Sequence, residues 1–139
     1  MRRESDRLRQ AERDLAHATV SLEHGDHEWA CYAAYQASEK AAKALLQSFG
    51  VDAWGHSVTF LLSEAKKDIA LPEHLVELAK ALDRHYVPAR YPHAHPQGAP
   101  MDFYTAKDAT AAIQASGEVV QYVRGRLSAH EHPPGDAGP

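Results

Sequence analysis

The sequence has one cysteine, Cys31, and no apolar run of about 20 residues. A single cysteine excludes an intrachain disulfide, and the missing apolar run excludes a membrane-spanning helix and any role in a membrane. Residues 1–7 are charged and lack the apolar core of a signal peptide. These absences together predict a cytoplasmic protein.

An excess of basic residues is also missing. Fifteen lysines and arginines stand against 19 acids in 139 residues, which gives a net charge of -4 with histidine neutral. General nucleic-acid coat proteins are usually basic, so that class is excluded, whereas a selective RNA or nucleotide site built from local basic residues is not. The length indicates one domain with a modest core.

The sequence contains no internal repeat and no segment that alternates with period two, so strands are not expected. Apolar residues instead recur at steps of three and four, which is typical of amphipathic helices. The predicted fold is all-α, a four- to five-helix up-and-down antiparallel bundle with a long proline-rich loop before the last helix. The expected helices cover residues 4–23, 27–49, 57–67, 72–85 and 105–128. Residues 129–139 have few apolar side chains and are expected to form a disordered tail.

Local signals mark the helix ends. Gly25 and Gly50 suit the left-handed position after a helix. Asp26 and Ser57 are candidate N-caps. The segment Thr105-Ala106-Lys107-Asp108 has the spacing of a capping box, with aspartate in place of glutamate.

Helix 27–49 is apolar over more than half of its circumference. Such a helix must be buried on more than one side, so we expect it at the centre of the bundle, with surface left over for a second copy of the chain. The expected polar stripe is made by Tyr32, Gln36, Glu39, Lys40, Lys43 and Gln47. A homodimer follows from this pattern.

The segment of residues 83–100, called the proline loop here, has prolines at positions 88, 92, 96 and 100. Each proline removes a backbone donor, so no regular helix can cross the segment. Two arginines, three histidines and two tyrosines lie in the loop, with no acid from Arg84 to Pro100. Long non-helical loops in compact helical domains are more often functional than not.

Arg90 and His95 form the sharpest chemical pattern in this loop. Cleavage of RNA without a metal needs a base for the 2′-hydroxyl, an acid for the leaving 5′-oxygen, and a cation for the phosphorane charge. A histidine and an arginine on one rigid element could supply these groups, with a further group from a symmetry-related copy. The alternative is that Arg90 pairs with Asp83 or Asp102 while His95 is exposed to solvent.

Further candidates for phosphate or nucleotide binding are Lys40, Lys43, Arg84, Tyr86 and Tyr91. The lysines could line a groove beneath the proline loop, and the tyrosines could stack on bases. The alternatives are a solvated lysine stripe and tyrosines that only pin the loop to the bundle.

A metal site could be proposed at His93 and His95, with Cys31 or His56 as further ligands. No Cys-x-x-Cys, His-Glu-x-x-His or carboxylate cluster supports it, so we expect no metal and no other cofactor. Cys31 as a nucleophile is also weak, because a thiol within an alanine-rich helix usually packs.

Four segments carry a resemblance to a known family. The run from Trp29 to Leu46 resembles the second helix of HEPN domains, and Gly55-His56-Ser57 looks like the step before their third helix. The run from Leu82 to Pro92, followed by Phe103-Tyr104-Thr105, is similar to a prokaryotic branch with an Arg-Tyr-Pro loop. The resemblance covers about residues 5–127 and makes residues 1–128 a HEPN-like helical bundle.

The resemblance implies a homodimeric bundle of four or five helices. Many such proteins are encoded beside a minimal nucleotidyltransferase and act with it as a toxin–antitoxin pair. Many HEPN domains are metal-independent RNases whose Arg-x(4–6)-His motifs meet across the dimer, and Arg90 with His95 satisfies that spacing. The expected function is therefore a metal-independent endoribonuclease. The alternative is a non-catalytic module that binds nucleotides or the nucleotidyltransferase.

Overall fold

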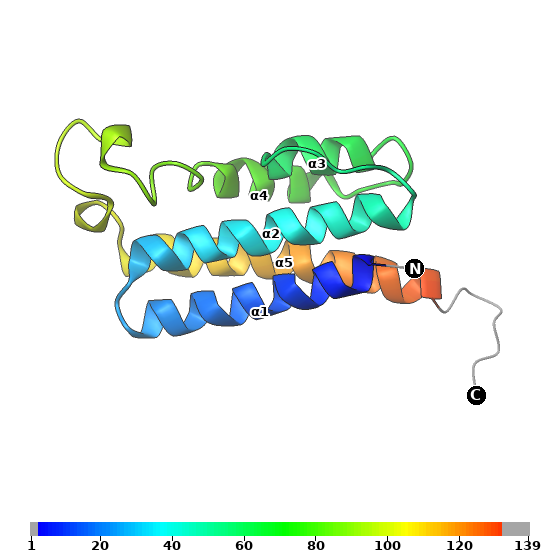
Figure 1. The fold of residues 1–139 in the computed structure, drawn as a ribbon, viewed down its shortest axis with the longest axis horizontal. Coiled ribbons are helices and arrows are strands. Elements are labelled where there is room, and N and C mark those ends of the chain that lie inside the picture. Colours follow the sequence, from blue (N-terminus) through cyan, green and yellow to red (C-terminus); the bar gives the residue numbers. More distant parts are fainter. Residues whose placement is uncertain (1–2, 132–139) are drawn as a thin grey trace.

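A computed structural model describes residues 3–131, and these residues form an all-helical bundle without strands (Figure 1). No helix among them is both long and apolar enough to cross a membrane. The elements in chain order are α1 (Glu4–Glu23), α2 (His27–Ser48), α3 (Val58–Ala65), α4 (Glu73–Asp83), the short 3-10 helices η1 (Pro92–Ala94) and η2 (Pro100–Asp102), and α5 (Ala106–Glu131). The all-α prediction is confirmed.

The predicted helix ends agree closely with the observed ones. The Ser57 hydroxyl accepts a hydrogen bond from the Phe60 amide at 3.0 Å, and Thr105 and Asp108 form the reciprocal bonds of a capping box. Asp26 occupies the predicted N-cap position of α2, although its side chain makes no capping hydrogen bond. Helix α5 continues to Glu131, three residues beyond its predicted end, and the rest of the predicted tail lies outside the described residues.

Helix α2 lies at the centre of the bundle and contacts each of the other α-helices. Figure 1 shows α1 and α5 on one side of it and α3 with α4 on the other. Six of its seven alanines are fully buried and allow close approach of its neighbours. A bond of 2.8 Å between the Ser38 and Ser116 hydroxyls joins α2 to α5 in the core. Glu39 was expected on the polar stripe of α2, but it is buried.

The start of α3 and the end of α4 lie side by side over the middle of α2 (Figure 1). The Asp83 carboxylate joins them, because it accepts hydrogen bonds from the backbone amides of Val58 and Thr59 at 2.8 and 3.0 Å. The hydroxyls of Ser57 and Thr59 donate to the same carboxylate at 3.1 and 2.6 Å. This contact fixes the segment before α3 against the segment after α4, and both segments contribute to the site described next.

Candidate functional site

The Arg90 guanidinium lies among three tyrosine rings. Its central carbon is 4.5 Å from the ring centre of Tyr32 and 4.7 Å from those of Tyr86 and Tyr91. Its Nε donates to the Tyr86 carbonyl oxygen at 2.8 Å, and one terminal nitrogen, Nη1, donates to the Tyr91 hydroxyl at 3.3 Å. Cation–π contacts and two hydrogen bonds therefore hold a permanent positive charge in one place.

A turn of the backbone over residues 86–90, called the Arg90 turn here, positions this side chain. The amides of Arg90 and Tyr91 both donate to the Val87 carbonyl oxygen, at 3.0 and 3.1 Å. The two acids that could have paired with Arg90 are engaged elsewhere: Asp83 caps α3, and Asp102 accepts from the Ala99 amide at 2.8 Å. The alternative of an Arg90–carboxylate pair within the described chain is therefore wrong.

His95 is attached to the same turn. Its Nε2 lies 2.8 Å from the Pro88 carbonyl oxygen, and its ring stacks on Phe103 with centres 4.7 Å apart and planes 7° apart. A carbonyl oxygen can only accept, so Nε2 carries a proton and Nδ1 holds the basic lone pair of the neutral ring. The ring is partly buried, rather than exposed to solvent as the alternative had it.

A second histidine, His56, contacts the same Tyr86 ring that the Arg90 guanidinium contacts. His56 stacks on Tyr86 with ring centres 5.1 Å apart and planes 17° apart, and its Nδ1 is 2.7 Å from a Glu39 carboxylate oxygen. The Tyr35 hydroxyl donates to the His56 backbone carbonyl oxygen. Burial, with the nearby carboxylates of Glu39 and Asp83, raises the pKa of Tyr35, so its phenol keeps the proton that it donates.

The two lysines predicted to bind phosphate, Lys40 and Lys43, contact different acids in different parts of the bundle. Lys40 pairs with Asp14 of α1 and lines a shallow cleft with residues of that helix. Lys43 lies 3.5 Å from the Glu39 carboxylate, next to His56. Lys43 is thus linked to the Tyr86 side of the site through Glu39, whereas the contact of Lys40 is with α1.

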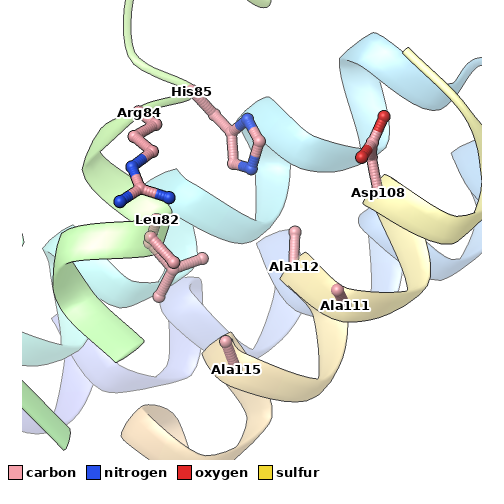
Figure 2. A pocket seen from close by; sticks show the side chains of 8 residues that line it. Leu82, Arg84, His85, Asp108, Ala111, Ala112 and Ala115 are labelled. Carbon is pink, nitrogen blue, oxygen red and sulfur yellow. The ribbon is translucent and has the colours of Figure 1, made fainter. Parts of the chain in front are cut away.

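Arg84 lies at a separate cleft of about 360 Å³ between the end of α4 and the start of α5. Figure 2 shows Arg84 and His85 above the alanines of α5, with Asp108 nearer the start of that helix. The His85 Nδ1 lies 3.0 Å from the Tyr104 hydroxyl, and burial lowers the pKa of His85. Of the predicted phosphate-binding residues, only Tyr86 and Tyr91 contact Arg90 directly.

The described residues contain no group of three or more histidine, cysteine, aspartate or glutamate side chains that could hold a metal ion. Cys31 is fully buried, and burial, with Asp108 and Glu28 as lesser contributors, raises the pKa of its thiol to about 12. A thiol of that kind packs and does not act as a nucleophile at neutral pH.

Four further residues of the site were not predicted from the sequence: Tyr32, Tyr35, Glu39 and His56. Tyr32, Tyr35 and Glu39 follow one another at steps of three and four on α2, so a single helix face presents them. The signal that could have indicated them was the presence of polar and aromatic side chains on one face of an otherwise apolar helix. The contact of His56 with them depends on the connector after α2 folding back along that helix, which no local pattern predicts.

The comparisons with known proteins agree with this architecture. A family model of the HEPN domain matches residues 5–126. The crystal structure of TT1696 from Thermus thermophilus is 45% identical with a TM-score of 0.88, and the match covers 91% of this chain and 100% of that one. The archaeal HEPN homologue ST0689 is 37% identical with a TM-score of 0.78, over 91% and 99% of the two chains.

The HEPN domain protein TM0613 from Thermotoga maritima is also similar, at 34% identity and a TM-score of 0.73 over 88% of this chain and 98% of that one. The search of curated proteins gave no match. The family model spans nearly all of the described bundle, and the similar structures share both its sequence and its fold. The chain therefore belongs to the HEPN domain family.

Proposed function

We propose that this protein is a metal-independent endoribonuclease that works as a homodimer, in a toxin–antitoxin pair with a minimal nucleotidyltransferase. The observation that supports the proposal is the common attachment of Arg90 and His95. The guanidinium is bonded to the Tyr86 carbonyl oxygen, and the imidazole to that of Pro88. One short turn thus carries a fixed cation and a histidine with a defined tautomer.

Each group suits one part of RNA transphosphorylation. Within the described residues, the Arg90 hydrogen bonds use Nε and Nη1, which leaves Nη2 for a phosphate oxygen. His95 can exchange a proton through Nδ1, because the backbone carbonyl occupies Nε2. The products would be a 2′,3′-cyclic phosphate and a 5′-hydroxyl end.

The test is cleavage of a mixed RNA pool by the purified protein in EDTA. Arg90→Ala and His95→Ala should each lower the rate by roughly 10²-fold or more, the usual scale for such groups. His93→Ala is the matched control, since His93 is exposed and its ring contact within the described chain is with Tyr91. Cleavage that persists unchanged in His95→Ala, or that EDTA abolishes, would contradict the mechanism.

The arrangement around Arg90 favours a second candidate function, a non-catalytic module for nucleotides or for the nucleotidyltransferase. Three tyrosines enclose the guanidinium, and Tyr91, which is 43% exposed and stacks on His93, gives a base an exposed group of rings to contact. This function predicts tight nucleotide or partner binding that Arg90→Ala weakens, with no RNA cleavage by the wild type. Isothermal calorimetry beside the cleavage assay separates the two functions.

A further inference from the structure

We propose that His56, oriented by Glu39, is a second catalytic residue of this site and acts as the base that accepts the proton of the RNA 2′-hydroxyl. The inference rests on the proposed endoribonuclease function and adds to it a residue outside the Arg-x4-His motif. It also supplies both proton-transfer groups from one chain.

The geometry of the pair defines which nitrogen is reactive. The Glu39 carboxylate, with a side chain only 10% exposed, lies 2.7 Å from His56 Nδ1. An ionised carboxylate only accepts hydrogen bonds, so Nδ1 carries the proton and Nε2 holds the lone pair. The His56 side chain is 60% exposed, so solvent or a substrate can reach the ring. A buried carboxylate behind an exposed imidazole is the arrangement that orients a general base in hydrolytic triads.

The His56 ring is also held in place by its neighbours. One contact is the stack on Tyr86, and another is the hydrogen bond from the Tyr35 hydroxyl to the His56 carbonyl oxygen. The next residue, Ser57, caps α3 and donates to Asp83. These contacts fix both the ring and the backbone of His56 next to a buried carboxylate.

Tyr86 links His56 to Arg90, because both side chains contact its ring. Tyr86 contacts the His56 ring at 5.1 Å between centres and the Arg90 guanidinium at 4.7 Å. Pro88 follows Tyr86 by two residues, and its carbonyl oxygen accepts a hydrogen bond from His95 Nε2. The Arg90 turn therefore connects one cation and two imidazoles, which are the three groups that metal-free RNA cleavage requires.

The reaction balances with these groups. His56 Nε2 accepts the 2′-hydroxyl proton, and the 2′-oxygen forms a bond to phosphorus while Arg90 faces the charge on the phosphoryl oxygens. The bond from phosphorus to the 5′-oxygen then breaks, and protonated His95 donates its Nδ1 proton to that oxygen. One proton is taken up and one is delivered, so no metal or redox partner is needed. The buried Glu39 carboxylate faces the positive charge that His56 acquires.

The titratable groups that face this pair are few. Lys43 lies 3.5 Å from the Glu39 carboxylate. Tyr35 and Tyr86 face the backbone and the ring of His56, and Arg90 lies beyond Tyr86. The His74–Glu118 pair provides a contrast, because both side chains are more than half exposed and their atoms are 3.6 Å apart. That pair has the character of an ordinary surface contact and serves as the matched control.

The experiment measures single-turnover RNA cleavage in EDTA between pH 5 and 9. His56→Gln should lower the rate roughly 10²-fold or more, with RNA binding retained, and His74→Gln should leave the rate unchanged. Glu39→Gln tests positioning: the rate should fall with RNA binding retained, and the nitrogen-15 spectrum of His56 should lose its preference for the Nδ1–H tautomer, because an amide can donate as well as accept. A merely structural Glu39 would lower the rate without changing the tautomer.

Two outcomes separate this inference from the proposed function. Cleavage at the wild-type rate by His56→Gln, with loss in Arg90→Ala and His95→Ala, overturns the role of His56 and leaves the endoribonuclease function intact. Absence of cyclic phosphate ends from the wild type overturns both. Nitrogen-15 NMR of the wild-type imidazoles needs no variant: the Nδ1–H tautomer at His56 supports the inference, and the Nε2–H tautomer contradicts it even if His56→Gln fails to fold.

Discussion

Removal of the Asp83 carboxylate should destabilise the fold measurably, because that group joins α3 to α4. It accepts hydrogen bonds from two backbone amides and two hydroxyls at the start of α3. Losing a helix cap costs about 0.5–2 kcal/mol, and hydrogen bonds to charged groups contribute about 1.5–3 kcal/mol each. Water can reach the exposed Ser57 end of this contact, so we expect Asp83→Ala to lower the free energy of unfolding by about 3 kcal/mol, near the value of one such bond plus the cap.

Urea unfolding at fixed protein concentration measures this loss. With a slope of about 2 kcal/mol/M, the midpoint should fall by about 1.5 M. Asp83→Asn keeps one acceptor oxygen and should lose less. Asp52→Ala is the control, since Asp52 is exposed and without a hydrogen-bond partner in the described chain, and its change should stay within about 0.5 kcal/mol. A loss below about 1 kcal/mol for Asp83→Ala would refute the assignment of Asp83 as the link between the two helices.

Four further outcomes follow from the packing. Ser116→Ala should cost about 0.5–1.5 kcal/mol in urea unfolding, because it removes the hydrogen bond between α2 and α5 while the Ser38 hydroxyl keeps its bond to the Ala34 carbonyl oxygen. Cys31 should resist a thiol reagent at pH 8 in the native protein and react only after denaturation, since its pKa is about 12 and it is fully buried; rapid native labelling would contradict this. Gly117→Ala should raise stability by about 0.5–1 kcal/mol in thermal or urea unfolding, because an added Cβ meets nothing within 4 Å in α5. Gly98→Ala should lower it, since φ there is +80° and a Cβ would lie 2.9 Å from Asp102.

The sequence was sufficient for the fold because each helix has its own periodicity and end signals. Ser57 and the Thr105–Asp108 box are local devices, and the structure shows both. Asp26 stands at the predicted N-cap position but makes no side-chain cap. Its backbone amide donates to the Ser21 carbonyl oxygen and its carbonyl oxygen accepts from the Ala30 amide, so the backbone of this turn is bonded locally.

The site was only partly predictable. The proline loop is one continuous segment, and its composition was enough to predict four residues of the site: Tyr86, Arg90, Tyr91 and His95. Glu39 looked like a member of a solvated stripe, because a helical wheel cannot show that the connector before α3 covers it. Contacts between segments far apart in the sequence, such as Glu39 with His56, depend on loop paths that periodicity does not determine.

The two lysines illustrate the same limit. Lys40 and Lys43 are close in sequence on α2, yet one pairs with Asp14 of α1 and the other with Glu39. A helical wheel separates their directions, but only the packing of α1 and the connector decides which acid each one meets. The rule that neighbouring charges form one patch therefore fails where a central helix has neighbours on several sides.

The most direct test of the central claim is end-group analysis of an RNA and of its matched copy with a 2′-deoxy nucleotide at the cleavage position, both incubated with the wild-type protein in EDTA. The account predicts a 2′,3′-cyclic phosphate and a 5′-hydroxyl end from the RNA, and binding without cleavage for the deoxy-substituted copy, because the attacking 2′-oxygen is missing. Cleavage of the deoxy-substituted copy, 3′-hydroxyl ends, or an RNA that stays intact under these conditions would contradict it.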